Sequence, residues 1–229
     1  MIIEKLGMII AAGGSGSRFS KTVNKLLVEY NNKPLIVHAL STFLPVISPG
    51  SLVVAAPADL LETMRQTVNE YLPDNQIVWT VGGATRLASI VNAFKLLPDD
   101  LKLLAIHDAA RPLATVKLLH ELCNEALIHG GAIPGSMPSD TIKVIDENHL
   151  ITGNLIRRDL AAVATPQVFD YSCYKKALSM LPEAVLTGVC EDPQLTDDAA
   201  LFNRGGFAVK VLFSSDCNFK VTVRSDLKA

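Results

Sequence analysis

The stretch Leu6–Phe19, LGMIIAAGGSGSRF, decides the fold of this chain. Its first part, LGMIIAA, is a continuous apolar run, which predicts a strand buried on both faces of a sheet. The glycine-rich part that follows allows backbone N–H groups to approach a ligand, because glycine has no Cβ atom and tolerates positive φ. A strand that runs into such a loop predicts an α/β sheet with a ligand at the carboxyl end of its first strand.

Further along the chain, short apolar runs alternate with segments of helical period. Buried strands are predicted at Leu6–Ala12, Ser51–Pro57, Gln76–Gly82 and Leu101–Asp108. Helices are predicted between and after them, at Pro34–Leu44, Ala58–Leu72, Thr85–Leu97 and Thr115–Gly130. This alternation predicts a single Rossmann-like, mostly parallel sheet flanked by helices, with ligands at the carboxyl ends of its strands.

The rhythm changes after Gly131, where two extended runs surround a polar turn at Asp146-Glu147-Asn148. They predict a projecting β-hairpin arm at about residues 138–160, on an otherwise single domain of residues 1–229. Because a two-stranded arm is marginally stable alone, we expect it to pack on a second copy of the chain in a homodimer. Later elements are predicted as helices at Tyr171–Leu181 and Thr196–Gly206, the latter capped by Gly205, and strands at Ala208–Ser214 and Asn218–Val223.

Composition limits the class of partner. The 229 residues are 49% apolar and carry a formal net charge of −2, which gives no general attraction to nucleic acid or to an anionic membrane. The four cysteines form no metal-ligand cluster, which is typical of free thiols in a reducing compartment. No apolar run approaches the ~20 residues of a membrane helix, so we expect a cytoplasmic protein.

The spacing of the glycine loop excludes two familiar phosphate-binding loops. A Walker A loop requires Gly-Lys-Ser/Thr after four intervening residues, but here Gly13 leads to Arg18 and Phe19. The dinucleotide-binding fingerprint requires a third small residue where Phe19 stands. Two cations, Arg18 and Lys25, instead follow the glycines and suit a polyphosphate whose charge rises during reaction. A flexible loop with two solvated cations is the alternative.

Two further strand ends carry candidate site residues. Asp108 ends the fourth predicted strand, and its carboxylate is suited to a hard cation such as Mg²⁺. Alternatively, Asp108 is a helix N-cap with Arg111 as its surface partner. His107 is interpreted as structural. The stretch Gly82–Ser89, GGATRLAS, forms a second glycine turn, and two such turns at one sheet edge can sandwich a base.

Seven motifs occur in order along the chain. They are AAGGSGSR (11–18) with Lys25, GGATRLAS (82–89), HDAARP (107–112), DTIK (140–143), TPQVF (165–169), TDDAAL (196–201) and NFKVT (218–222). Together they resemble the 2-C-methyl-D-erythritol 4-phosphate cytidylyltransferase family, over about Leu6–Leu227. That family makes a CDP-polyol from CTP in the non-mevalonate route to isoprenoid precursors. The resemblance implies a Mg²⁺-dependent nucleotidyltransferase that works as a homodimer.

The resemblance also implies roles for individual residues. Arg18, Lys25 and Lys220 would be catalytic: Arg18 and Lys25 would stabilise the pentacoordinate α-phosphorus and the departing pyrophosphate, and Lys220 would reach both substrates. The nucleotide would be bound by Ala11, Ala12, Gly13, Gly14, Ser15, Gly16, Gly83, Arg86, Ser89, Asp108, Ala109 and Arg111, with Asp108 also holding Mg²⁺. The polyol phosphate would be bound by Thr141, Arg157, Thr165 and Lys220, the arm being exchanged across the dimer.

Several residues depart from the family pattern. The chain has Asn24-Lys25-Leu26 where the family usually has Pro-Lys-Gln, and Ala84 stands at a position that is often polar. Arg158 is an alternative to Arg157 for the acceptor phosphate. Ribitol 5-phosphate is an alternative acceptor, and a nucleotide-binding regulatory module without turnover is an alternative function. The loop spacing disfavours a nicotinamide oxidoreductase.

Overall fold

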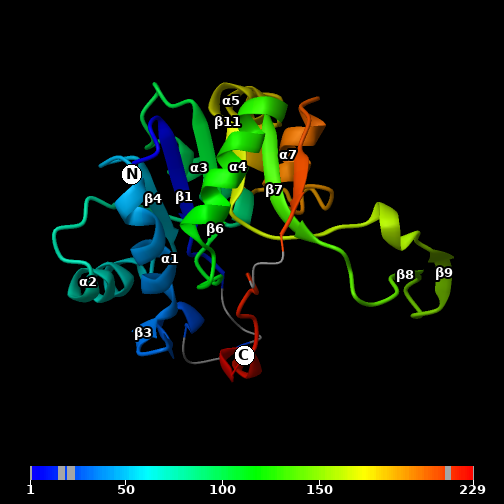
Figure 1. Ribbon diagram of the computed structural model, residues 1–229, viewed down its shortest axis with the longest axis horizontal. Coiled ribbons are helices and arrows are strands. Elements are labelled where there is room, and N and C mark those ends of the chain that lie inside the picture. Colours follow the sequence, from blue (N-terminus) through cyan, green and yellow to red (C-terminus); the bar gives the residue numbers. More distant parts are fainter. Residues whose placement is uncertain (1, 15–18, 20–23, 215–217, 229) are drawn as a thin grey trace.

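A computed structural model of the protein describes residues 2–14, 19, 24–214 and 218–228 (Figure 1). Its centre is an eight-stranded sheet in the order β10-β7-β11-β6-β1-β4-β5, with β12 also paired to β7. The strands are β1 (Leu6–Ala11), β4 (Leu52–Ala56), β5 (Val78–Val81), β6 (Leu103–Asp108), β7 (Gly131–Ser136), β10 (Ala162–Val163), β11 (Gln167–Asp170) and β12 (Lys210–Phe213). The predicted mostly parallel sheet is confirmed.

The four strands expected from apolar runs form the parallel half of the sheet. β1 lies between β4 and β6 and runs parallel to both, and β4 pairs in parallel with β5. The register places Ala11 opposite both Ala55 and Asp108, so these carboxyl ends meet at one edge. The edge therefore collects the turns that follow β1, β4, β5 and β6.

The other half of the sheet contains strands that the apolar pattern does not predict. β11 is antiparallel to both β6 and β7, and β10 is antiparallel to β7. β7 reads GAIPGS, in which two glycines and a proline hide the usual strand composition. Glycine at position 135 lets β12 pack closely, because a Cβ atom there would lie 2.6 Å from Cγ1 of Val211 and would force a shift.

Helices cover both faces of the sheet. On one face the core contains side chains of α1 (Leu35–Phe43), α2 (Leu61–Tyr71) and α4 (Val116–His129), packed with Met8 and Ile10 of β1. On the other face it contains side chains of α3 (Arg86–Phe94), α5 (Tyr171–Ser179) and α7 (Asp198–Arg204), packed with Ile9. Alternate residues of β1 thus face opposite layers, as a strand with two buried faces requires.

Local chemistry accounts for several helix ends. Thr85 caps α3 by accepting the N–H of Ala88, and Thr115 caps α4 by accepting the N–H of Leu118. Gly130 ends α4 with φ of 94°, as predicted. Gly205 is the C-cap of α7, as predicted, although its φ of −69° is helical and the left-handed residue is the following Gly206, with φ of 84°.

The predicted hairpin forms and extends away from the main sheet (Figure 1). β8 (Lys143–Ile145) and β9 (Ile151–Asn154) are antiparallel and, among the described residues, pair only with each other. Oδ1 of Asp146 orders the turn by accepting the N–H groups of Asn148 and Leu150, both at 2.9 Å. A 3₁₀ turn, Arg157–Asp159, lies at the end of the arm nearer the sheet.

The C-terminal segment differs from its prediction. β12 lies within the expected Ala208–Ser214, but the described residues 218–223 form no strand and lead into a 3₁₀ helix, Arg224–Lys228. Their hydrogen bonds go to loops and side chains, such as Val221 N–H to the Ala110 carbonyl, in place of a neighbouring strand.

The remaining described elements are short. They are η1 (Lys25–Leu27), β2 (Glu29–Tyr30), β3 (Lys33–Pro34), η2 (Leu44–Val46) and α6 (Glu183–Leu186). Among the described residues, no helix combines the length and the apolar composition needed to cross a membrane.

Candidate active site

A cavity of about 580 Å³ lies at the carboxyl ends of β1, β4, β5 and β6. It is lined by Ala11, Gly13, Gly14, Lys25, Leu26, Pro57, Ala58, Gly82, Gly83, Ala84, Thr85, Arg86, Ser89, Asp108, Ala110, Lys220 and Thr222. Its volume is in the range of small-molecule sites, and its place in the sheet is where α/β folds bind ligands. The structure therefore brings together residues from four predicted motifs.

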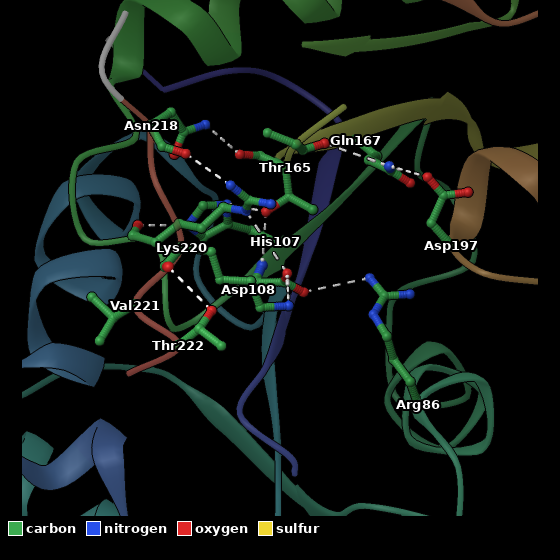
Figure 2. A network of polar contacts seen from close by, with 12 residues as sticks. Arg86, His107, Asp108, Thr165, Gln167, Asp197, Asn218, Lys220, Val221 and Thr222 are labelled. Carbon is green, nitrogen blue, oxygen red and sulfur yellow. Dashed lines mark hydrogen bonds and ion pairs between the residues drawn. The ribbon is translucent and has the colours of Figure 1, made fainter. Parts of the chain in front are cut away.

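Asp108 is the central charge of this cavity (Figure 2). Its Oδ2 lies 2.8 Å from Nζ of Lys220, and its Oδ1 lies 3.6 Å from Nη2 of Arg86. Nε of Arg111 is 3.8 Å from Oδ2. Burial alone would raise the pKa of Asp108, but the charges of Arg86 and Lys220 outweigh it and lower that pKa to about 2. The carboxylate is therefore ionised at neutral pH, and the cations around it exceed its charge.

A short segment near the C-terminus places Lys220 and contacts Lys25. Nζ of Lys25, in η1, donates to the carbonyl of Val221 at 2.9 Å, and the N–H of Val221 donates to the Ala110 carbonyl at 2.9 Å. Residues from the beginning, the middle and the end of the chain thus meet beside Asp108. Both predicted catalytic lysines that the structure describes line the cavity.

The second glycine turn forms another wall of the cavity. A Cβ atom on Gly83 would lie 2.4 Å from Cβ of Ala88, so α3 can pack this closely only against a glycine. The hydroxyl of Ser89 accepts the Gly83 N–H at 3.0 Å and donates to the carbonyl of Thr85 at 2.9 Å. Ser89 therefore shapes the turn, and its proton is already used within the protein.

Behind Asp108 lies a buried hydrogen-bonded group centred on His107 (Figure 2). Nε2 of His107 faces the carbonyl of Arg111 at 3.2 Å, which fixes the proton on Nε2 because a carbonyl only accepts. Nδ1 then accepts from the Thr165 hydroxyl at 3.0 Å, and that hydroxyl oxygen accepts the Asp108 N–H at 3.0 Å. Burial lowers the pKa of His107 to about 4. The interpretation of His107 as structural agrees with this geometry.

Other predicted residues lie away from the cavity wall. Ala12 and Ala109 are buried in the core, and Arg111 donates from Nη1 to the carbonyl of Asn218 at 2.8 Å. Thr141 and Arg157 lie on the arm, where Nη2 of Arg157 donates to the Thr141 hydroxyl at 3.1 Å. Three predicted residues lie outside the described residues, namely Ser15, Gly16 and Arg18.

Some residues of the cavity wall were absent from the sequence prediction. Pro57 and Ala58 follow β4 directly, and Ala110 and Thr222 lie next to predicted site residues. The signal for Pro57 and Ala58 was available, because the ends of neighbouring parallel strands share one edge. Pro57 and Ala58 were not predicted because their side chains carry no charge or hydroxyl group that indicates a binding role.

Comparison with known proteins identifies the family. The sequence model of the 2-C-methyl-D-erythritol 4-phosphate cytidylyltransferase family matches residues 6–229. This chain belongs to that family. It is 34% identical over 222 residues to the 2-C-methyl-D-erythritol 4-phosphate cytidylyltransferase of Prochlorococcus marinus (strain MIT 9313), which is 96% of this chain and 94% of that protein. The corresponding protein of Trichodesmium erythraeum (strain IMS101) is 34% identical over 97% of this chain and 96% of its own length.

Solved structures agree with this assignment. The 4-diphosphocytidyl-2C-methyl-D-erythritol synthase of Anaerococcus prevotii DSM 20548 has a TM-score of 0.76 and 25% identity, covering 97% of this chain and 94% of its own. The 2-C-methyl-D-erythritol 4-phosphate cytidylyltransferase of Thermus thermophilus has a TM-score of 0.73 and 25% identity, covering 98% of this chain and 96% of its own. The sequence resemblance to this family is thereby confirmed.

The donor set at Asp108 fits the divalent cation that the resemblance implied. Among the described residues there is no group of three or more His, Cys, Asp or Glu side chains that holds a metal by itself. Mg²⁺ is commonly bound through one or two carboxylates plus substrate phosphates and waters, so a lone carboxylate beside a phosphate site suffices. Oδ2 of Asp108 accepts from Lys220, while the cation nearest Oδ1 in these contacts, Arg86, is 3.6 Å away. Oδ1 is therefore the better placed oxygen.

Proposed function

We propose that this protein transfers a cytidylyl group from CTP to 2-C-methyl-D-erythritol 4-phosphate, with release of pyrophosphate. The observation that carries the proposal is a cavity lined by Lys25, Arg86 and Lys220, the last two paired with Asp108, in a chain of the cytidylyltransferase family. A regulatory module that only binds a nucleotide has no need of several cations beside a reacting phosphate. The family also argues against a nicotinamide oxidoreductase.

The chemistry explains the residue types of the cavity. A phosphate oxygen of the acceptor attacks the α-phosphorus of CTP, a new P–O bond forms, and the bond to pyrophosphate breaks. Because the attacking phosphate is already anionic, no general base is required. The main obstacle is repulsion between two anions, which fixed cations and in-line positioning offset. Lys25 and Lys220 supply such charge, and Arg18 is proposed to join them.

The nucleotide is proposed to lie between the two glycine turns. Gly13 and Gly14 after β1 line the cavity and would face the triphosphate, and Gly82 and Gly83 after β5 line it and would face the base. Asp108 would hold Mg²⁺, which supplies further charge neutralisation at the phosphates when bound. Asp108 itself is kept ionised by Arg86 and Lys220.

The acceptor site is proposed to be completed by a second copy of the chain. Thr141 and Arg157 contact each other on the arm and do not belong to the described wall of the cavity. The arm also exposes apolar side chains, among them Ile151, which is 64% exposed, and Ile156. We propose that one nucleotidyltransferase domain, residues 1–229, inserts its arm of about residues 138–160 beside the cavity of a partner. The Thr141 contact favours Arg157 over Arg158 for the acceptor phosphate.

A pyrophosphate-release assay tests the function directly. Purified protein is incubated with CTP and Mg²⁺, and with either 2-C-methyl-D-erythritol 4-phosphate or ribitol 5-phosphate. We expect release with the first acceptor only, and formation of the matching CDP-polyol by mass spectrometry. Release only with ribitol 5-phosphate would assign a different acceptor, and release with neither would refute the proposed transfer.

A further inference from the structure

Arg86, the first residue of α3, contacts two carboxylates, those of Asp108 and Asp198. Nη1 of Arg86 is 2.6 Å from Oδ2 of Asp198, whereas its Nη2 is 3.6 Å from Oδ1 of Asp108. The first contact is a short charge-assisted hydrogen bond, and the second is longer than a hydrogen bond. Arg86 is therefore held chiefly by Asp198.

Asp198 is anchored within the protein. It is the first residue of α7, it is 1% exposed, and its Oδ1 accepts from the hydroxyl of Tyr174 at 2.7 Å. Tyr174 is itself fully buried on α5, against Phe169 and Phe94. Both oxygens of the carboxylate thus have fixed donors. Asp198 has no freedom to follow Arg86 toward the cavity.

The charges show why this anchoring matters. An arginine side chain stays protonated in proteins, and here two carboxylates, Asp198 and Asp108, lie close to the guanidinium. A charged guanidinium without its own counter-ion would move against the nearest carboxylate, which is Asp108. Arginine pairs carboxylates through two parallel hydrogen bonds, and such a pair would occupy Oδ1 of Asp108. The remaining oxygen is already bonded to Lys220.

We propose that Asp198 is a positioning residue that holds Arg86 away from Asp108, so that Oδ1 of Asp108 stays available to a divalent cation. This inference rests on the proposed function, because it assumes that Asp108 meets a metal–nucleotide complex. Asp198 itself touches neither reacting group and acts only through Arg86. Tyr174 supports it by holding the second carboxylate oxygen.

The test compares CTP binding with and without the metal, by isothermal titration of wild-type protein and variants in Mg²⁺ or in EDTA. The measured quantity is the gain in CTP affinity that Mg²⁺ provides. For Asp198→Asn we expect this gain to fall about tenfold, as is typical when the support of a metal ligand is removed. Asp198→Glu keeps the charge and should restore part of the gain.

The matched control is Asp197→Asn, which removes the same charge one residue away. The Asp197 carboxylate accepts from Gln167 at 2.8 Å and caps α7, and asparagine also caps helices well. Asp197→Asn should keep the wild-type Mg²⁺ gain. An equal loss in both variants would mean that charge alone is responsible, and an unchanged gain in Asp198→Asn would overturn the proposal.

Two further variants guard against a folding defect. If Asp198→Asn shows no cooperative thermal transition, Tyr174→Phe is used, and a reduction of the Mg²⁺ gain by about threefold is expected from losing one supporting hydrogen bond. An unchanged gain there would refute the role. In an Arg86→Met background, Asp198→Asn should cause no additional loss, since Asp198 acts through Arg86. If the wild-type protein turns over in the pyrophosphate assay but Mg²⁺ does not increase its affinity for CTP, this inference is overturned while the proposed function stands.

Discussion

At the residue scale, Asp108 shows how one carboxylate organises several cations. Lys220 hydrogen-bonds it directly, while Arg86 and Arg111 approach at 3.6 and 3.8 Å. Arg86 has Asp198 as a second counter-ion, but the single charge of Asp108 cannot neutralise Lys220 and Arg111 as well, so excess positive charge remains for a polyphosphate. The Asp108 carboxylate also offsets the repulsion between these cations, which keeps them close together before substrate binds.

Lys25 is expected to contribute charge stabilisation in the transition state. We predict that Lys25→Met lowers turnover with CTP and acceptor by about 10²- to 10³-fold, the scale for removing one transition-state donor, while CTP affinity changes less. Lys33→Met is the control, because Lys33 is exposed on β3 and does not line the cavity. Near-normal turnover of Lys25→Met in single-turnover kinetics would exclude this role.

His107 predicts a specific pH dependence of stability. Its pKa is lowered to about 4 by burial, whereas an unfolded histidine titrates near 6.5, so between these values the unfolded state binds the additional proton. The contribution is fully present above pH 6.5 and is lost as pH falls toward 4, amounting to about 3 kcal/mol.

Urea unfolding at several pH values measures this effect. The free energy of unfolding of wild type should fall more steeply than that of His107→Gln below pH 6.5, by up to about 1.4 kcal/mol per pH unit. His120→Gln, which changes an exposed histidine of α4, should keep the wild-type slope. Parallel curves for wild type and His107→Gln would show that His107 does not titrate in this way.

At the scale of elements, two strand–helix turns form the cavity. The turn after β5 is shaped by Gly83, the cap Thr85 and the hydroxyl of Ser89, which hold the backbone against the start of α3. This arrangement also places Arg86 at the first position of α3, where it reaches Asp108 from the side opposite Lys220 (Figure 2). Turn geometry therefore determines the electrostatics of the site.

Gly83→Ala tests the geometry of this turn. The added methyl group would lie 2.4 Å from Cβ and 2.9 Å from the carbonyl carbon of Ala88, so backbone must shift. We expect a loss of stability of about 1–3 kcal/mol in urea unfolding, with weaker CTP binding. Gly13→Ala is the matched variant in the same cavity, where the nearest atom is 3.8 Å away, and its stability should change by less than about 0.5 kcal/mol. Equal midpoints for the two variants would contradict this explanation.

At the scale of the whole molecule, the sheet order determines which segments meet. β1, in the middle of the order, brings the first glycine turn beside the end of β6, and the C-terminal segment returns across the same edge through Val221 and Ala110. The arm lies on the other side of the molecule, beyond β7 and β10 (Figure 1). This position supports the proposal that the arm serves the cavity of a partner copy.

Subunit complementation tests the proposed homodimer. Arg157→Ala should raise the KM for the polyol phosphate, and Lys220→Ala should lower turnover strongly. If a partner's arm completes the site, coexpressed Arg157→Ala and Lys220→Ala chains form mixed dimers in which one of two sites is intact. Random pairing then gives about a quarter of wild-type activity, far above either variant alone. Activity no higher than the mean of the two variants, or a monomer in sedimentation analysis, would contradict the exchanged arm.

Much of the fold was predictable because its signals are local. Apolar runs predicted the four parallel strands, and the caps at Thr85 and Gly130 follow from side-chain chemistry and glycine conformation. β7 and β11 were not predicted, because their places depend on pairing with distant strands and not on composition. The segment 218–223 was predicted as a strand, but among the described residues it pairs with no strand of a sheet.

The sequence by itself determined the class of fold, the family and the kinds of residue in the site, because periodicity, glycine spacing and ordered motifs are properties of the chain. Only the tertiary structure decided that Asp108 contacts both Arg86 and Lys220, and that Asp198 forms an ion pair with Arg86. It also decided that Nδ1 of His107 accepts a hydrogen bond from the hydroxyl of Thr165. These contacts join residues far apart in the chain, and their energies depend on distance and burial, which packing alone establishes.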